Sequence, residues 1–161
     1  MPWIRLVAAV VMVLAAAVLL CLRGPGGEES PNRALTDADA TTKAIGDVSN
    51  ALTRIFTYSS EDTATAERAA TESLSGRAAG EYRRLFVQVK RQAPVDRLAL
   101  KTRVVRAGLV SLTTDKAQLL VFLDQVTTRN GRPSGTTAAA QLSVTAELRD
   151  GLWRITELRS R

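Results

Sequence analysis

The aspartate at position 124 interrupts an apolar run, AQLLVFLDQVTT, and is the first candidate for chemistry in this sequence. If the run is a strand, alternate side chains share a face, so Asp124 lies beside Phe122 and Val126. A carboxylate on an apolar face needs a partner or a cavity, because an unpaired buried charge is unfavourable. Asp124 then lines a pocket or acts as an acid–base group in an enzyme. The alternative is that it is solvated, or paired with an arginine such as Arg103.

Basic residues form the second candidate group. Between positions 83 and 106 the only acidic residue is Asp96, whereas residues 28–81 are net acidic. Such an asymmetry suits anionic lipid headgroups or an acidic partner, and a merely solvated face is the alternative. Nucleic-acid binding is disfavoured, because it needs interleaved aromatic side chains for stacking. The group comprises Arg83, Arg84, Lys90, Arg91, Arg97, Lys101, Arg103 and Arg106.

Two absences restrict the chemistry further. The chain has no histidine, and its only cysteine is Cys21. Nucleophilic triads, histidine or cysteine metal sites and an intrachain disulfide are therefore excluded. The net charge of +6 is too mild to indicate nucleic-acid binding. We expect a non-enzymatic protein with no cofactor and no bound metal.

The first part of the chain is predicted to be an uncleaved membrane anchor, residues 1–23. Residues 6–22 carry no charge, and together with Trp3 they approach the roughly 20 residues that span a bilayer as a helix. The only A-x-A pattern within residues 1–23 lies inside the apolar run, which argues against a cleaved signal peptide. Cys21 follows Leu20 rather than a small residue, which argues against a lipoprotein. The anchor positions are Trp3, Leu6, Leu14 and Leu22.

Arg5 and Arg23 flank this run, so the positive-inside rule alone leaves its orientation nearly balanced. Because few residues precede the run, an N-terminus held inside is the simpler arrangement. Residues 24–35, which include GPGGEESPN, are expected to be a flexible linker. Residues 36–161 are then an exported domain on the outer side of the cytoplasmic membrane.

Three helices are expected ahead of the strands. The first begins at Thr36 and runs to about residue 57. Asp62 or Thr63 caps the second, which ends near residue 75, and Pro94 ends the third. Their apolar residues recur at helical spacing: Ala40, Ala44, Val48, Leu52, Ile55 and Phe56 in the first, and Tyr82, Leu85, Phe86, Val89 and Ala93 in the third.

After Pro94 the hydrophobic period changes to two, which indicates strands. A half-buried strand begins near Leu98, and a more apolar one covers 117–128 and is expected at the centre of the sheet. Asn130-Gly131 opens a loop that runs through Gly135, and a third strand covers 138–148. Asp150-Gly151 is a hairpin signal before a last strand at 152–158. Helices followed by an antiparallel meander predict an α+β domain.

This order of segments resembles the actinobacterial Mce-associated membrane proteins. The resemblance rests on an anchor and linker, IFTYSSED, LSG before EYRRL, VFLDQVTT and DGLWRITEL. That family often ends the apolar strand in Asn-Gln, whereas this chain has Asp124-Gln125. Its last strand usually follows a Gly-x-Trp pattern, which Gly151 and Trp153 match. Trp153 itself either anchors a partner or lies in the core.

The resemblance implies a cone of the nuclear transport factor 2 type, with three helices across a curved four-stranded sheet. It also implies an accessory role beside Mce lipid importers, with transporter subunits, other envelope proteins, the membrane and anionic lipid as partners. The same architecture occurs in scaffold subunits of type IV secretion and conjugation machines. A third hypothesis is a small-molecule-binding or carboxylate-based domain with a pocket around Asp124.

Overall fold

A computed structural model describes residues 31–161 of the chain, with the backbone alone at residues 133–136. Its elements are α2 (Ala38–Ile55), α3 (Ala64–Ser73), α4 (Gly76–Asp96), β1 (Leu98–Leu112), β2 (Lys116–Arg129), β3 (Arg132–Arg149) and β4 (Leu152–Ser160). The strands form one antiparallel sheet in the order β1-β2-β3-β4. The predicted α+β class, with helices ahead of a meander and 117–128 inside the sheet, is therefore confirmed.

Within residues 31–161, no helix is both long enough and apolar enough to cross a membrane. The predicted anchor, with Trp3, Leu6, Leu14 and Leu22, lies outside the described residues.

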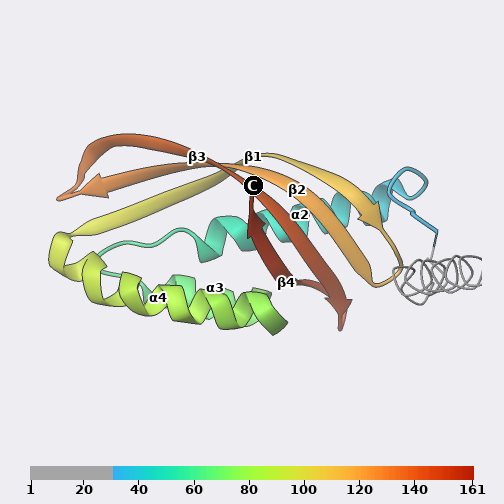
Figure 1. Ribbon diagram of the computed structural model, residues 1–161, viewed down its shortest axis with the longest axis horizontal. Coiled ribbons are helices and arrows are strands. Elements are labelled where there is room, and N and C mark those ends of the chain that lie inside the picture. The colour runs from blue at the N-terminus through green and yellow to red at the C-terminus, as the bar shows by residue number, and fades with distance from the viewer. Residues whose placement is uncertain (1–30) are drawn as a thin grey trace, which may run out of the picture. The chain divides into compact units, whose positions relative to one another are not determined.

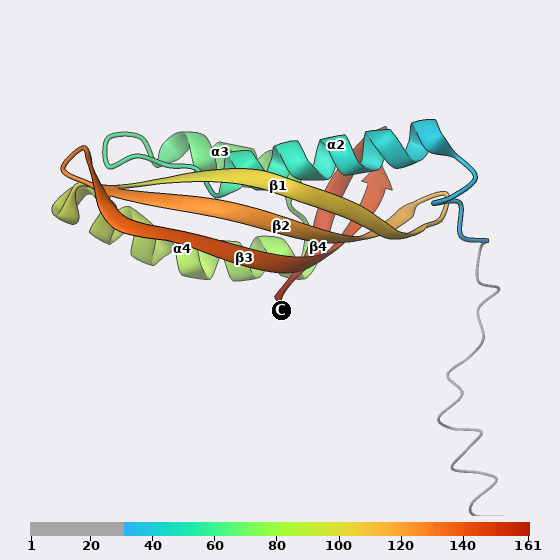
Figure 2. The same ribbon diagram turned by 90° about the horizontal axis from the view of Figure 1, so that it is seen from above.

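The helices pack on one face of a curved sheet (Figure 1). Seen from above, α2 and α3 lie near the β1 edge of the sheet, and α4 lies near the opposite edge (Figure 2). The inner face of β2, which points to the helices, carries the buried residues Leu119, Val121 and Leu123. Phe122 and Val126 alternate with them and are 39% and 37% exposed, because none of α2, α3 and α4 covers the outer face.

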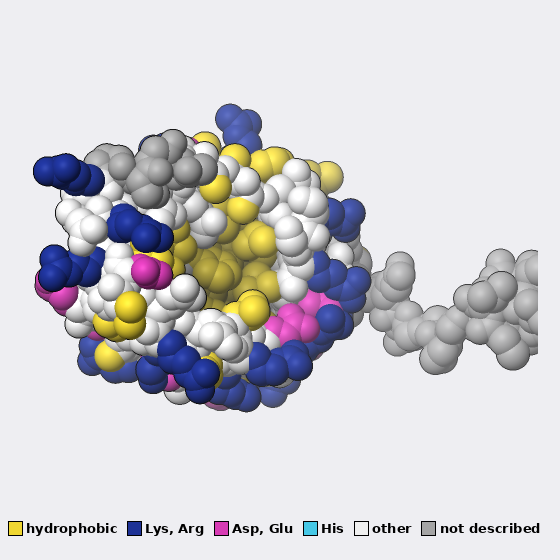
Figure 3. Space-filling model, turned by 60° about the vertical axis from the view of Figure 1, so that its left-hand side comes forward, with side chains coloured by type: hydrophobic (Ala, Val, Ile, Leu, Met, Phe, Trp, Pro, Cys, Tyr) yellow, Lys and Arg dark blue, Asp and Glu magenta, His cyan; other side chains and the backbone are white. Residues whose placement is uncertain are grey.

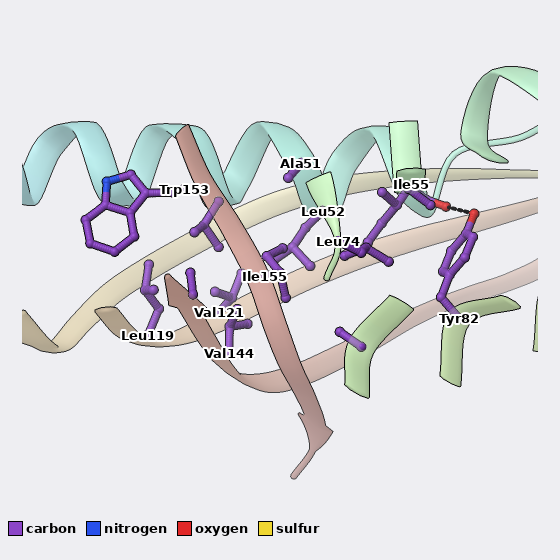
Figure 4. Packing of buried hydrophobic residues seen from close by; sticks show 14 of the residues in the cluster. Ala51, Leu52, Ile55, Leu74, Tyr82, Leu119, Val121, Val144, Trp153 and Ile155 are labelled. Atoms are coloured by element: carbon purple, nitrogen blue, oxygen red, sulfur yellow. Dashed lines mark hydrogen bonds between the residues drawn. The ribbon is translucent and has the colours of Figure 1, made fainter. Parts of the chain in front are cut away.

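A hydrophobic core fills the space between the sheet and the helices (Figure 4). Leu52 of α2, Val121 of β2 and Ile155 of β4 are each fully enclosed. The segment between α3 and α4 is fastened to β4, since the Ser75 N–H donates to the Ile155 carbonyl at 2.9 Å. Burial of these side chains removes apolar area from water and is the main favourable contribution to folding.

Aspartate side chains cap the starts of α2 and α3. The Asp37 carboxylate accepts a hydrogen bond from the Ala40 N–H at 2.9 Å, and this bond lowers the pKa of Asp37. Asp37, and not Thr36, is thus the N-cap of α2. In front of α3, the Asp62 carboxylate accepts from the Thr65 N–H at 3.0 Å, as one of the two predicted caps.

The prediction that Pro94 ends the third helix is wrong. Helix α4 continues to Asp96, and Arg97 ends it in the left-handed conformation at φ 50°. A proline costs most in a helix interior, where its ring clashes with the preceding turn and one N–H bond is lost. Here Pro94 lies in the last turn with its ring exposed, and the Arg97 N–H donates to the Ala93 and Pro94 carbonyls.

The predicted loop at 130–135 is also wrong. Asn130 and Gly131 have φ values of 52° and 73° and form a two-residue turn, so β3 already begins at Arg132. Positive φ at both turn positions matches the right-handed twist of a hairpin. Asp150 and Gly151, at 53° and 75°, form the predicted second turn in the same way.

Asn32–Arg161 forms a compact unit. The Asn32 side-chain oxygen accepts from the Leu112 N–H at 2.9 Å, and the Arg33 N–H donates to the Leu112 carbonyl at 2.7 Å. These bonds join residues predicted to be linker to the end of β1.

Candidate functional site

Asp124 lies on the outer face of the sheet. It is the direct neighbour of Arg103 in the β1–β2 register, and the Arg103 Nη2 and Asp124 Oδ2 atoms are 3.2 Å apart. The apolar side chains that share its face are therefore surface residues and not the core. Both side chains are substantially exposed, so this pair contributes about 0–1 kcal/mol to stability. Of the alternatives considered for Asp124, the structure shows the one in which the carboxylate pairs with Arg103.

Two β-bulges shape the β1 part of the outer face. The register with β2 shifts between Val104 and Arg106 and again between Leu109 and Ser111. The additional residues, Val105 and Val110, are 54% and 61% exposed. A bulge turns a side chain out of the ladder and increases the local twist. Both bulges thus place valines at the surface.

We define the outer sheet face as the apolar residues Val110, Leu120, Phe122 and Val126 with the charged residues Lys101, Arg103, Arg106 and Asp124. A depression of about 450 Å³ crosses all four strands and includes Val110 and Leu120 of this face in its lining. The face combines exposed apolar area with an excess of positive charge, which is the composition of a protein-binding surface.

The basic residues predicted as one group divide between two surfaces. Arg83 and Arg84 lie on α4, on the helix side of the sheet, whereas Arg103 points away from the helices. Lys90 pairs with Glu67 of α3 at 2.8 Å. Figure 3 shows Lys and Arg side chains set around an apolar hollow and not gathered in a single patch.

The Gln125 side chain lies on the inner face of the sheet, where it forms a hydrogen bond within the domain. Its amide donates to the Thr102 hydroxyl at 3.2 Å, and that hydroxyl donates to the Phe56 carbonyl at 2.7 Å. The Thr102 N–H donates to the Thr57 hydroxyl at 3.1 Å. Thr102 is only 3% exposed, so this network satisfies polar groups that burial would otherwise leave without partners.

Trp153 is 6% exposed and belongs to the hydrophobic core beside α2 (Figure 4). Of its two interpretations, the core one holds. Among residues 31–161, no three carboxylate side chains lie close enough together to hold a metal ion.

A groove of about 510 Å³ between α3 and α4 was not predicted from the sequence. Its floor includes Tyr82 and Phe86, whose rings stack with centroids 4.9 Å apart. Ala70 of α3 and Ala79 of α4 line it, and their small side chains leave the space between the helices open. Arg83 lines this groove, whereas Arg84 does not. The alanine-rich sequence of α3 was the one available signal.

Tyr82→Phe is expected to lower the free energy of unfolding by about 1–2 kcal/mol at pH 7. The buried Tyr82 hydroxyl donates to the Ile55 carbonyl at 2.8 Å, and this bond would be lost. Burial also raises the pKa of Tyr82 well above its ordinary value. The unfolded state then ionises near pH 10 while the folded state keeps its proton, so stability falls as pH rises above 10.

Urea unfolding at several pH values checks this expectation. Above pH 10 the curve of Tyr82→Phe should fall less steeply than that of the natural chain, and the two should converge. Tyr58→Phe is the control, because burial also raises the pKa of Tyr58 but no hydrogen bond of its hydroxyl is found within residues 31–161. Parallel curves for the natural chain and Tyr82→Phe would contradict the expectation.

The arrangement of helices and strands defines a fold shared with two solved structures, each at a TM-score of 0.51. The intermembrane space region of the chloroplast protein ARC6 is 10% identical, and the match covers 78% of this chain and 96% of that one. The putative transfer protein TraH from the Gram-positive conjugative plasmid pIP501 is 12% identical, with 74% and 92% covered. Identities this low show the fold alone.

In sequence, the chain is similar to the uncharacterized protein Rv1362c of Mycobacterium tuberculosis strain H37Rv and to its counterpart in strain CDC 1551. Each is 32% identical over 124 residues, which are 76% of this chain and 56% of the relative. The chain thus spans about half the length of the curated relatives that it matches. No protein-family model matches it.

Proposed function

We propose that the protein is a non-enzymatic, membrane-anchored scaffold of the cell envelope that binds another envelope protein through its outer sheet face. The apolar run at residues 6–22 would anchor it in the cytoplasmic membrane, with the N-terminus inside and the domain outside. An Mce-type lipid import complex is the first candidate for its assembly, on the resemblance of VFLDQVTT and DGLWRITEL to Mce-associated proteins.

The observation that carries the proposal is the exposure of apolar side chains on the outer sheet face, which none of α2, α3 and α4 covers. Phe122 is 39% exposed and Val110 61% exposed. Exposed apolar area ringed by polar groups is characteristic of protein interaction sites. Arg106 is the direct neighbour of Phe122 across the sheet. Aromatic and arginine side chains are enriched in protein–protein interfaces.

Affinity purification of the tagged full-length chain from gently solubilised native membranes, followed by mass spectrometry, tests the proposal. The natural chain should recover Mce-domain subunits and their permease. A variant with Val110→Ala and Phe122→Ala should lose most of this recovery, because truncation of apolar anchors removes the largest contributions to binding.

The matched control carries Val95→Ala and Leu152→Ala, which are also exposed apolar residues, at 82% and 57%, but lie outside the outer sheet face. It should recover partners as the natural chain does. If both variants retained the partners, the role of the outer sheet face would be refuted. Recovery of nothing above background by the natural chain would refute the scaffold function itself.

A second candidate assembly is a secretion or conjugation machine of the type IV class. The similarity of this fold to TraH, described as a putative transfer protein of a conjugative plasmid, favours it. Recovery of secretion-channel components in the same purification, in place of Mce subunits, would support this candidate.

A further inference from the structure

Apolar side chains form much of the groove between α3 and α4. Tyr82 and Phe86 stack at its floor, and Leu74 lines it at the end where α3 turns into α4. Val87, which is 46% exposed, lines it farther along α4. Its volume of about 510 Å³ lies within the range of about 300–1,000 Å³ found for small-molecule sites.

Positive charge outweighs negative charge at this groove. Arg83, Lys90 and Arg91 line it from α4, and Glu67 lines it from α3. Glu67 pairs with Lys90 at 2.8 Å, which connects the two helices. No ion pair of Arg83 or Arg91 is found within residues 31–161. Two cations that lie two helical turns apart beside an apolar floor are therefore free to bind an anion.

We propose that this groove binds a single-chain anionic amphiphile, with its acyl chain along Phe86 and Val87 and its headgroup paired with Arg83 or Arg91. The floor supplies apolar area for the chain, and the guanidinium groups supply donors for a carboxylate or phosphate. This inference goes beyond the proposed scaffold function and holds whichever assembly the protein joins. A free fatty acid and a lysophospholipid share the required chemistry.

The test is photoaffinity labelling of the full-length protein in membrane vesicles with a diazirine analogue of palmitic acid. Tryptic digestion and mass spectrometry should place the label on AATESLSGR, residues 69–77, and on LFVQVK, residues 85–90. Unlabelled palmitate should compete with the probe. Label confined to peptides that contribute no residue to the groove would overturn the proposal.

Two matched pairs of variants test the chain site and the headgroup site. Val87→Asp places a carboxylate in the groove and should reduce labelling of the intact protein about tenfold. Leu85→Asp, on the same helix but outside the groove and 72% exposed, should label like the natural chain. The double change Arg83→Glu and Arg91→Glu should reduce labelling about fivefold or more, whereas Arg84→Glu should not. Equal labelling within either pair would overturn the proposal.

Probe chemistry separates the sources of the ligand. Selective labelling by the palmitic acid probe supports a free fatty acid, and selective labelling by a diazirine lysophosphatidate supports a lysophospholipid. Equal labelling by an uncharged diazirine hexadecanol would overturn the role of the cations. A photo-crosslinking residue at position 87 that captured a polypeptide and no lipid would show that a partner helix fills the groove, and would also overturn the proposal.

Discussion

Trp153→Ala is expected to lower the free energy of unfolding of residues 32–161 by about 3–5 kcal/mol. The indole is 6% exposed in the core cluster, so its removal leaves a cavity that neighbouring side chains fill only in part. A domain of this size has a total stability of about 5–15 kcal/mol. The variant should therefore lose a large part of the stability of the domain.

Urea denaturation followed by far-ultraviolet circular dichroism measures this loss. Leu152→Ala is the control, because it changes the preceding residue, whose side chain is 57% exposed, and should alter stability by no more than about 0.5 kcal/mol. If Trp153→Ala kept its stability and lost only the recovery of a partner, Trp153 would be an interface anchor and its assignment to the core would be refuted.

Thr102→Val is expected to destabilise the domain by about 2–4 kcal/mol, although the two side chains have nearly the same shape. The valine would leave the Phe56 carbonyl without the donor that it now has at 2.7 Å, and the Gln125 amide without its acceptor at 3.2 Å. Each unsatisfied buried polar group costs about 1–3 kcal/mol. The same denaturation measurement checks the result.

Thr137→Val is the control for the change of side chain, because Thr137 is exposed on β3, and it should be nearly neutral. A double-mutant cycle with Gln125→Leu tests the network directly. When Gln125 is replaced, its amide no longer needs an acceptor, so Thr102→Val should cost about 1 kcal/mol less than in the natural chain. Strictly additive losses would show that Gln125 and Thr102 do not depend on each other.

Local patterns in the sequence determined most of the fold. The helical spacing of Val48, Leu52 and Ile55 correctly predicted the buried side of α2, because side chains three and four positions apart share one face. Alternation correctly predicted four strands, and Asp150-Gly151 correctly predicted a hairpin turn, since a two-residue turn depends only on local backbone conformation. These properties depend on neighbours along the chain.

Only the tertiary structure decided which face of each strand or helix is covered by other elements. Alternation placed Asp124 with Phe122 and Val126, but their strand has apolar residues on both faces, and the helices cover the face with Leu119, Val121 and Leu123. The groove likewise depends on how α3 and α4 pack, because Ala70 and Ala79 leave a space only when they face each other. Periodicity is a property of one segment, whereas exposure, partners and grooves arise from contacts between segments that are distant in sequence.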